Sequence, residues 1–311
     1  MQKLDWANHS VLAEIERHLE IVAPRPVLVI ATEGARERYR DALHQLTGRI
    51  ELSDLRSAID ADSYGVIVAL AETTQAARQL YSNLAAAKNA GAAVVICVPE
   101  RRIARAPANG DQGVLHAPAM YWLAGIYAST LPRGDYVEFG VFDGNTLAMA
   151  FHNLKATCTR FHAFDSFKGI GGTIDAERTH FGDGQYYANV ETLHYNMRFA
   201  GAERERITAT AGFFEETLMN RTPQSYGIES ASVVHIDTDV YAPALLALQF
   251  ITPVLPQGAL LLFDDYDQLA ASNDKGERRA VREWLGANPN IELEEYRRYT
   301  AFSRAFIVHR I

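Results

Sequence analysis

Short apolar runs alternate with segments of helical periodicity from one end of the sequence to the other. In the first third, apolar runs cover 26–31, 65–71 and 92–98, and segments such as "ARERYRDALHQL" lie between them. This alternation is typical of a parallel sheet with crossover helices, so we predict an α/β fold.

A polar segment at 99–113, which contains Pro, Gly and Asn, interrupts the alternation. Because it has no apolar periodicity, we interpret it as a linker. The sequence then predicts two domains, a smaller Rossmann-like α/β domain at 1–105 and a larger domain at 112–311.

The larger domain is expected to contain a seven-stranded sheet whose last strand is antiparallel. A helix at 243–252 and a polar, aromatic insertion at about 169–195 are also expected. Six of the strands are located by their apolar runs, at 136–141, 160–167, 206–212, 232–237, 259–265 and within 302–311.

Two consecutive strands of this domain end in pairs of carboxylates. Asp237 and Asp239 follow the first strand, and Asp264 and Asp265 follow the second. Sequential strands are usually neighbours, so their carboxyl ends should converge. Like charges repel one another, whereas gathered oxygen ligands suit Mg²⁺ or Mn²⁺. The pattern favours a cation site over unrelated turn and helix-cap aspartates.

Further candidate ligand contacts lie at the ends of other strands in this domain. In "YVEFGVFDGNT", Gly140 and Gly144 allow a tight turn that a ligand can approach, and Glu138 is placed to receive an ammonium group. Asp165 ends the next strand, where an acid often accepts ribose hydroxyls. A structural turn and a helix-cap aspartate are the alternative interpretations.

A third strand ends in Gly212, followed by Phe213 and Phe214. Such a pair could line an adenine pocket, although adjacent phenylalanines belong more often to a core.

The composition is that of an ordinary globular protein. The chain has 311 residues, of which 48% are hydrophobic and 22% charged, and a net charge of −8. The acidic balance argues against a nucleic-acid partner. Cys97 and Cys158 are expected to be small buried residues, because no disulfide or zinc spacing is present.

No membrane span or signal peptide is expected. The uncharged segment 240–263 is interrupted by Pro243, Pro253, Pro256 and Gly258, so we interpret it as a buried helix, a turn and a strand. The first 20 residues form an amphipathic pattern with acids and lack the apolar core of a signal peptide. The expected location is the cytoplasm.

One other enzyme class shares part of the acidic pattern. "VVHIDTDVY" also matches the nucleophile motif of haloacid dehalogenase-type phosphatases. Those enzymes need a lysine and a long intervening stretch, whereas 240–263 contains neither Lys nor Arg. A phosphatase is therefore disfavoured.

Taken together, the motifs resemble the macrocin O-methyltransferase (TylF) family, which includes the mycinamicin and novobiocin sugar O-methyltransferases. The resemblance covers about residues 115–311. The matching pieces, in the family's order, are "YVEFGVFDGNT", "FDSFKG", "GFFEETL", "HIDTDVYAPALLAL", "GALLLFDDYD" and "GERRAV".

The resemblance implies a class I methyltransferase fold, with a Rossmann-like sheet that binds S-adenosylmethionine. It also implies Mg²⁺ or Mn²⁺, a hydroxyl acceptor that is often on a sugar, a homo-oligomer, and a mobile lid for which 169–195 is the candidate. The acceptor would be a small molecule or glycan.

The resemblance also assigns roles residue by residue. It implies Asp237, Asp264 and Asp265 as metal ligands and Asp239 as the general base. The implied contacts of S-adenosylmethionine are Glu138, Gly140, Gly144, Thr146, Asp165, Ser166, Gly212 and Phe213. The loop reads Asp143-Gly144-Asn145-Thr146 where the family more often has Arg-Gly-Gly-Ser.

The sequence leaves alternatives to this function and to the general base open. A catechol-type methyltransferase would use the same metal site, a silent methyltransferase fold would serve assembly, and His180 is a weaker candidate base.

In the N-terminal domain, the first turn has the single glycine Gly34 and the acidic Glu33. We therefore expect this domain to bind no NAD and to position the acceptor or build the oligomer.

Overall fold

The structure is a computed structural model that describes residues 6–53, 59–60, 63–97, 117–174, 176–178 and 180–311. The chain forms two compact units. The first comprises residues 1–110 and 191–199, and the second comprises 111–190 and 200–311. The expected linker at 99–113 lies outside the described residues.

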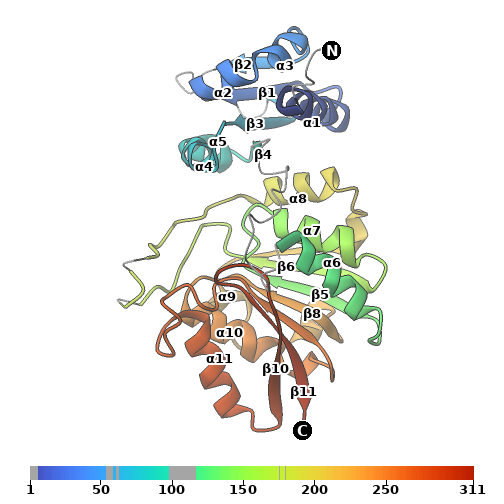
Figure 1. The fold of residues 1–311 in the computed structure, drawn as a ribbon, viewed down its shortest axis with the longest axis vertical. Helices are drawn as coiled ribbons and strands as arrows, with labels where there is room; N and C mark the ends of the chain where they lie inside the picture. Colours follow the sequence, from blue (N-terminus) through green and yellow to red (C-terminus); the bar gives the residue numbers. More distant parts are fainter. Residues whose placement is uncertain (1–5, 54–58, 61–62, 98–116, 175, 179) are drawn as a thin grey trace. The chain divides into compact units, whose positions relative to one another are not determined.

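The first unit is built on a parallel four-stranded sheet of order β2-β1-β3-β4 (Figure 1). The strands are β1 (Val27–Ala31), β2 (Glu51–Ser53), β3 (Val66–Leu70) and β4 (Val94–Cys97). Three of them confirm the apolar runs of the sequence. The sequence analysis missed β2, because it has only three residues and two of them are exposed.

The helices of this unit follow the same alternation. Helix α1 precedes the sheet, as its amphipathic pattern predicts, and the others connect the strands. Their bounds are α1 (Trp6–Val22), α2 (Glu33–Arg38), α3 (Arg40–Gln45), α4 (Thr74–Asn83) and α5 (Ala85–Asn89).

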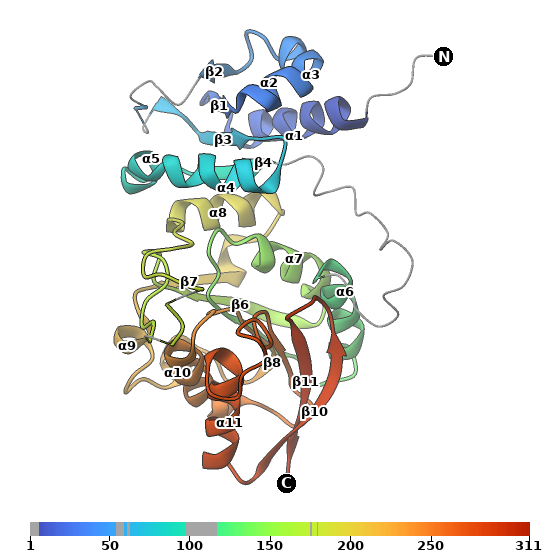
Figure 2. The same ribbon diagram turned by 60° about the vertical axis from the view of Figure 1, so that its left-hand side comes forward.

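Helix α8 (Val190–Phe199) belongs to the first unit from Glu191 onward, although the residues on either side of it belong to the second. It lies beside β4 (Figure 2), and the Thr192 hydroxyl accepts a hydrogen bond from the backbone N–H of Val94 at 3.0 Å. The Tyr195 hydroxyl and His18 Nδ1 are 2.5 Å apart. The expected bounds of 112–311 place this helix in the larger domain, whereas its contacts place it with the first unit.

The second unit holds a seven-stranded sheet of order β10-β11-β9-β8-β5-β6-β7. Strand β11 is antiparallel to both of its neighbours, as expected for the last strand, and the remaining pairs are parallel. The strands are β5 (Gly134–Phe139), β6 (Cys158–Asp165), β7 (Ile207–Ala211), β8 (Ala231–Ile236), β9 (Leu260–Phe263), β10 (Ile291–Arg298) and β11 (Arg304–Arg310).

Strand β10 was not predicted from the sequence. Its segment "IELEEYRR" is mostly charged, and five of its eight residues are exposed. Such a composition is typical of an edge strand, where charged side chains discourage pairing with another chain, and it hides the alternation that marks a strand.

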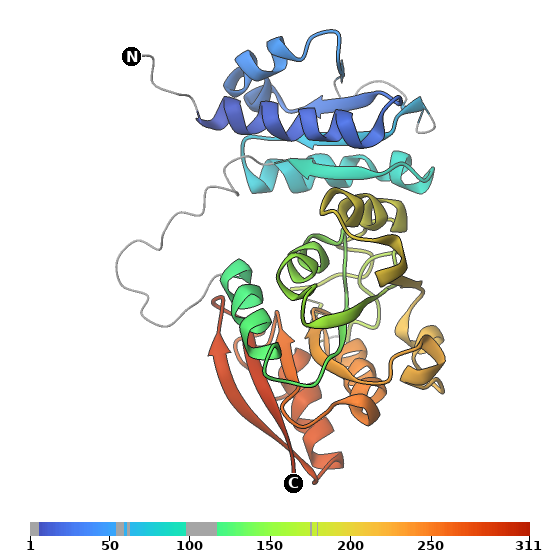
Figure 3. The ribbon, with the colours of Figure 1, turned by 90° about the vertical axis from the view of Figure 1, so that its right-hand side faces the viewer.

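Helices cover both faces of this sheet, α6 and α7 on one face and α10 and α11 on the other (Figures 1 and 3). Helix α10 begins at Tyr241, so Pro243 falls in its first turn, where a missing N–H costs no hydrogen bond. The bounds are α6 (Ala117–Ala128), α7 (Asn145–Leu154), α9 (Phe214–Thr217), α10 (Tyr241–Ile251), α11 (Gly276–Ala287), and the 3-10 turns η3 (Arg204–Arg206), η4 (Pro223–Tyr226) and η5 (Thr252–Val254).

The main core of this unit lies between the sheet and helices α10 and α11. Phe139, Phe263 and Trp284 are among its buried residues. The uncharged segment 240–263 supplies α10 and β9, as predicted. No helix in the described part of the chain is long and apolar enough to cross a membrane. Cys97 and Cys158 are both buried and form no disulfide bond, which confirms the sequence interpretation.

The placement of α8 can be tested by hydrogen–deuterium exchange. Tyr195→Ala should destabilise by about 3 kcal/mol, because Tyr195 is buried against the core of the first unit. We expect faster exchange in β1 and unchanged exchange in β8. The matched variant Tyr226→Ala, which packs on the core of the second unit, should show the reverse. Faster exchange in β8 caused by Tyr195→Ala would contradict the placement.

Candidate active site

The carboxyl ends of β5, β8 and β9 form the candidate site. Strand β5 pairs with β6 on one side and with β8 on the other. The chain adds strands on one side of β5 up to β7 and then continues on its other side with β8 and β9, so β5 and β8 flank a topological switch point. Ligands of open α/β sheets bind at such switch points. Strands β8 and β9 are parallel neighbours, as predicted, with Ile236 opposite Phe263. Their ends therefore place Asp237 and Asp264 side by side.

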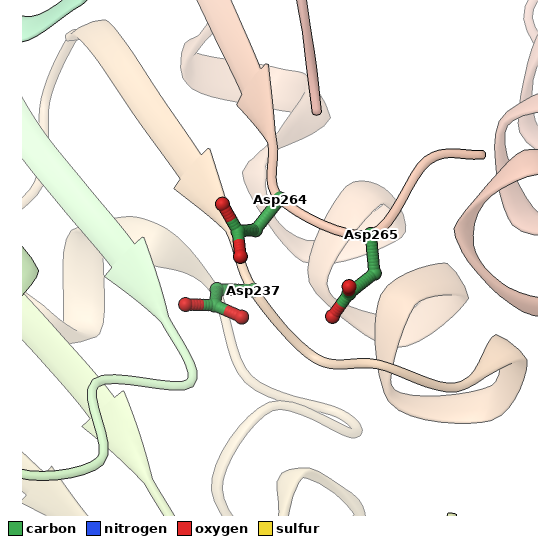
Figure 4. A group of neighbouring side chains, drawn as sticks. All are labelled: Asp237, Asp264 and Asp265. Atoms are coloured by element: carbon green, nitrogen blue, oxygen red, sulfur yellow. The ribbon is translucent and has the colours of Figure 1, made fainter. Parts of the chain in front are cut away.

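Three carboxylates gather here, and Figure 4 shows them beside one another at the ends of the two strands. Asp237, Asp264 and Asp265 each offer an oxygen, and these oxygens lie within 4.8 Å of one another. The Ser303 hydroxyl donates to Asp264 Oδ1 at 3.1 Å. The donor set consists entirely of hard oxygens, which fits Mg²⁺ or Mn²⁺.

The charges of this cluster are poorly compensated. Burial, reinforced by the charge of Asp264, raises the pKa of Asp237 well above its usual range. Burial and the charge of Asp239 raise the pKa of Asp265 to about 11. Among the described residues, no Lys or Arg forms an ion pair with these carboxylates. The cluster therefore requires protons or a bound cation.

Asp239 has a distinct environment. Its backbone lies in the left-handed region at φ 60°, which Asp adopts more readily than most residues. Burial raises its pKa to about 6, and a hydrogen bond shared with Asp265 opposes part of that rise. Its carboxyl group is thus hydrogen-bonded to the cluster without being one of the three gathered carboxylates.

Glu277 is a residue that the sequence analysis did not assign. It is fully buried, and its two oxygens accept from the backbone N–H groups of Thr238 at 3.3 Å and Asp265 at 3.1 Å. Burial raises its pKa well above the usual range. Glu277 therefore ties the turn after β8 to the turn after β9. The available signal was its place in the first turn of the helix beginning "GERRAV".

Gly140 is required by the close approach of two strand ends. Its φ is 84°, and a Cβ at this position would lie 1.8 Å from the carbonyl oxygen of Asp237. Gly144 has φ 82° and precedes α7 as its N-cap. The glycine turn therefore lies directly against the backbone of the acidic cluster.

Asp165 holds the glycine turn in place. Its Oδ2 accepts from the backbone N–H groups of Val141 at 2.9 Å and Phe142 at 3.0 Å. Its Oδ1 accepts from the backbone N–H of Phe167 at 2.6 Å. Burial raises the pKa of Asp165, and these three backbone hydrogen bonds oppose the rise. These bonds tie the end of β6 to the turn after β5.

Glu138 is directed into the protein. It is fully buried, accepts from the Tyr136 hydroxyl at 2.7 Å and from the Thr146 hydroxyl, and lies 3.6 Å from His235 Nδ1. Its protein partners thus occupy the carboxylate that the sequence suggested for an ammonium group. Thr146 is one of these partners, and its hydroxyl donates to Glu138.

The remaining candidates line the end of β7 and the turn after β6. The backbone N–H of Gly212 donates to the Asp165 carbonyl at 3.0 Å, and the Ser166 hydroxyl donates to the Gly169 carbonyl at 2.8 Å. Lys168 Nζ lies 5.7 Å from the centre of the half-buried Phe213 ring. Phe214 is buried in the core.

Residues 137–266 match the protein family described as "Methyltransferase domain". The solved structure of the O-methyltransferase NovP is 20% identical with a TM-score of 0.51, covering 62% of this chain and 79% of that chain. CalS11, a calicheamicin methyltransferase, is also 20% identical, with a TM-score of 0.50 and coverage of 61% and 77%. These likenesses confirm the class I methyltransferase fold.

A curated relative of this methyltransferase-like domain comes from Streptomyces olivaceus. It is named 8-demethyl-8-(2,3-dimethoxy-alpha-L-rhamnosyl)-tetracenomycin-C 4'-O-methyltransferase and is 27% identical over 156 residues. The match covers 47% of this chain and 58% of the relative.

The contact between the glycine turn and the acidic cluster can be tested with two glycine variants of the methyltransferase-like domain. Gly140→Ala should weaken Mn²⁺ binding by at least about 10-fold, because the new Cβ would displace the backbone of Asp237. Gly201→Ala is the matched control, with φ 79° and no atom within 4 Å of the added Cβ. Titration calorimetry measures both variants. Equal Mn²⁺ affinities would show that the turn does not support the cluster.

The electrostatics predict a pH-dependent effect of cations on stability. The folded pKa of Asp239, about 6, lies above its ordinary value, so the folded state binds more protons than the unfolded state between about pH 4 and 6. In chelator, the stability present at low pH should therefore be lost as pH rises through 6, and Asp265 extends this loss upward. A cation relieves the repulsion only where the carboxylates are ionised.

Thermal unfolding with and without Mg²⁺ measures this effect. The rise in Tm on adding Mg²⁺ should be larger at pH 8 than at pH 5 by about 3 °C, roughly 1 kcal/mol for a domain of this size. Asp239→Asn should flatten the pH dependence in chelator, because an amide does not ionise. An equal Tm rise at both pH values would contradict the assignment.

Proposed function

We propose that this chain is an O-methyltransferase that uses S-adenosylmethionine and a divalent cation, Mg²⁺ or Mn²⁺, to methylate a hydroxyl of a sugar or glycosylated metabolite. The observation that carries the proposal is the gathering of Asp237, Asp264 and Asp265 beside the switch point of a methyltransferase fold. The motif order supports a place in the TylF family.

The proposed sites use the two sides of the switch point. Asp237, Asp264 and Asp265 would hold the cation, which supplies a Lewis acid that lowers the pKa of an acceptor hydroxyl. S-adenosylmethionine supplies the methyl group. The residues proposed to hold it are Gly140, Gly144, Asp165, Ser166, Gly212 and Phe213, with Glu138 and Thr146 supporting the glycine turn from behind.

Asp239 is the proposed base. It lies two residues after Asp237 and shares a hydrogen bond with Asp265, so its carboxylate borders the cluster. A carboxylate in that position can take the proton from an acceptor hydroxyl held at the cluster. The fixed turn around it, with Glu277 bound to the N–H of Thr238, keeps this carboxylate oriented before the acceptor arrives.

The acceptor class rests on the relatives. The Streptomyces olivaceus relative is named for methylation of a rhamnosyl group, and NovP is named as an O-methyltransferase. A cation between oxygen ligands serves neighbouring hydroxyls of a sugar well, because two oxygens can share it. We therefore propose a sugar hydroxyl as the methyl acceptor.

The N-terminal unit is proposed to position the acceptor or to build a homo-oligomer. Its first strand-to-helix turn is acidic: Glu33 opens α2, and the Glu72 carboxylate would lie 2.8 Å from a Cβ on Gly34. The Thr32 hydroxyl donates to Glu72. Two carboxylates at this turn would repel a dinucleotide phosphate.

Methyl transfer should depend on the cation. With radiolabelled S-adenosylmethionine and a panel of rhamnosylated acceptors, EDTA should abolish transfer and Mg²⁺ or Mn²⁺ should restore it. Asp264→Asn should lower kcat/KM by more than about 100-fold, because it removes a charged oxygen ligand. Circular dichroism should remain that of the wild-type protein.

A catechol in the same panel separates the alternative substrate class. Transfer to catechol with none to any sugar would overturn the sugar proposal. Full activity in EDTA would overturn the cation proposal. Calorimetry with S-adenosylhomocysteine tests the cofactor site separately, and Asp165→Ala should weaken that binding by about 1–3 kcal/mol through lost charged hydrogen bonds.

A further inference from the structure

Glu177, in the insertion between β6 and α8, is a buried carboxylate that the proposed reaction does not use. Its relative exposure is 0%. A buried carboxylate is costly without compensation, and no Lys or Arg among the described residues forms an ion pair with it. Its direct hydrogen-bond partners are backbone N–H groups, and the positive charge of Arg279 also interacts with it.

Glu177 binds the first residues of two helices. Its Oε1 accepts from the backbone N–H of Tyr241 at 3.1 Å and from that of Gly276 at 2.8 Å. Its Oε2 accepts from the backbone N–H of Ile174 at 3.3 Å. Tyr241 begins α10 and Gly276 begins α11, so one carboxylate meets the positive ends of two helix dipoles.

Neither helix has a capping side chain of its own. The N-cap residues are Val240 and Lys275, and neither makes a side-chain capping hydrogen bond. Glu177 therefore supplies to both helices the acceptor that an N-cap Ser, Thr, Asp or Asn ordinarily supplies to one.

The two helix starts frame the acidic cluster. Tyr241 lies two residues after Asp239 in the chain, and Gly276 is followed by Glu277, whose carboxylate binds the N–H groups of Thr238 and Asp265. Glu177 thus holds together the chain segments that carry the two acidic pairs.

Apolar contacts secure the insertion at the same place. Phe181 and Ile170 of the insertion pack with Val240 and Leu269. The insertion is thus attached by the buried hydrogen bonds of the Glu177 carboxylate and by a small apolar cluster, both next to the turn that carries Asp239.

We propose that Glu177 is a positioning residue: by binding the N-termini of α10 and α11, it couples closure of the 169–189 insertion to the geometry of the Asp237, Asp264 and Asp265 site. The inference rests on the proposed function, because it assumes that this site holds a divalent cation. Coupling of this kind is reciprocal, so cation binding also stabilises the closed insertion.

The test measures Mn²⁺ binding and closure of the insertion in the full chain. Glu177→Ala should weaken Mn²⁺ binding by about 10- to 100-fold, the usual effect of removing a group that orients metal ligands. Glu177→Gln, which keeps one acceptor oxygen and the side-chain volume, should lose less. The affinity for S-adenosylhomocysteine should stay within about 3-fold of wild type in both variants, and Glu229→Ala, at an exposed position, is the matched control.

Closure is measured by trypsin cleavage after Arg178, whose side chain is 53% exposed and follows Glu177 directly. Mn²⁺ should slow this cleavage in the wild-type protein, because cleavage requires local opening of the insertion. In Glu177→Ala, cleavage should be faster and independent of Mn²⁺. Mass spectrometry of the fragments identifies the site.

The outcomes separate the two proposals. Wild-type protein that binds no Mn²⁺ would overturn the proposed function and this inference with it. Wild-type protein that binds Mn²⁺, with unchanged Mn²⁺ affinity in Glu177→Ala, would overturn the inference alone, even where cleavage is faster. If Glu177→Ala does not fold, the affinity of Glu177→Gln decides: weaker Mn²⁺ binding at unchanged S-adenosylhomocysteine affinity supports the coupling, and wild-type affinity overturns it.

Discussion

Repulsion between carboxylates at the ends of β8 and β9 is the constraint on which the rest of the site depends. The pairing of β8 with β9 brings together the carboxylates of Asp237, Asp264 and Asp265, although their like charges repel one another. Burial, reinforced by the neighbouring carboxylates, raises the pKa values of Asp237 and Asp265. Buried carboxylates this close together are stable only when they bind protons or a cation. The strand order, which brings them together, therefore creates this requirement.

Two further acids show a different solution to the same problem. Glu177 and Glu277 are both fully buried, but each has backbone N–H groups as partners on both of its oxygens. Backbone donors compensate these two carboxylates, whereas the gathered aspartates keep oxygens available for a ligand. The contrast separates these two buried glutamates from the three gathered aspartates that are proposed to hold the cation.

The sequence predicted those features that depend on local pattern and on neighbouring strands. The pairing of β8 with β9 follows from chain order, the antiparallel last strand was expected from a methyltransferase-type sheet, and both are present. It did not predict β10, whose charged residues hide its alternation, or that Tyr136 and Thr146 donate hydrogen bonds to a buried Glu138. Glu177 was also missed, because its partners lie 64 and 99 residues away along the chain.

The interleaved path of α8 has a consequence for how the protein is made. The first unit gains Tyr195 and the Thr192 contact with edge strand β4 only from residues that follow nearly half of the second unit in the chain. Domains that are continuous in sequence can fold one after another as they leave the ribosome. Here the N-terminal unit is complete only once residue 199 has been synthesised, so β4 lacks its contact with Thr192 while β5 and β6 are already emerging.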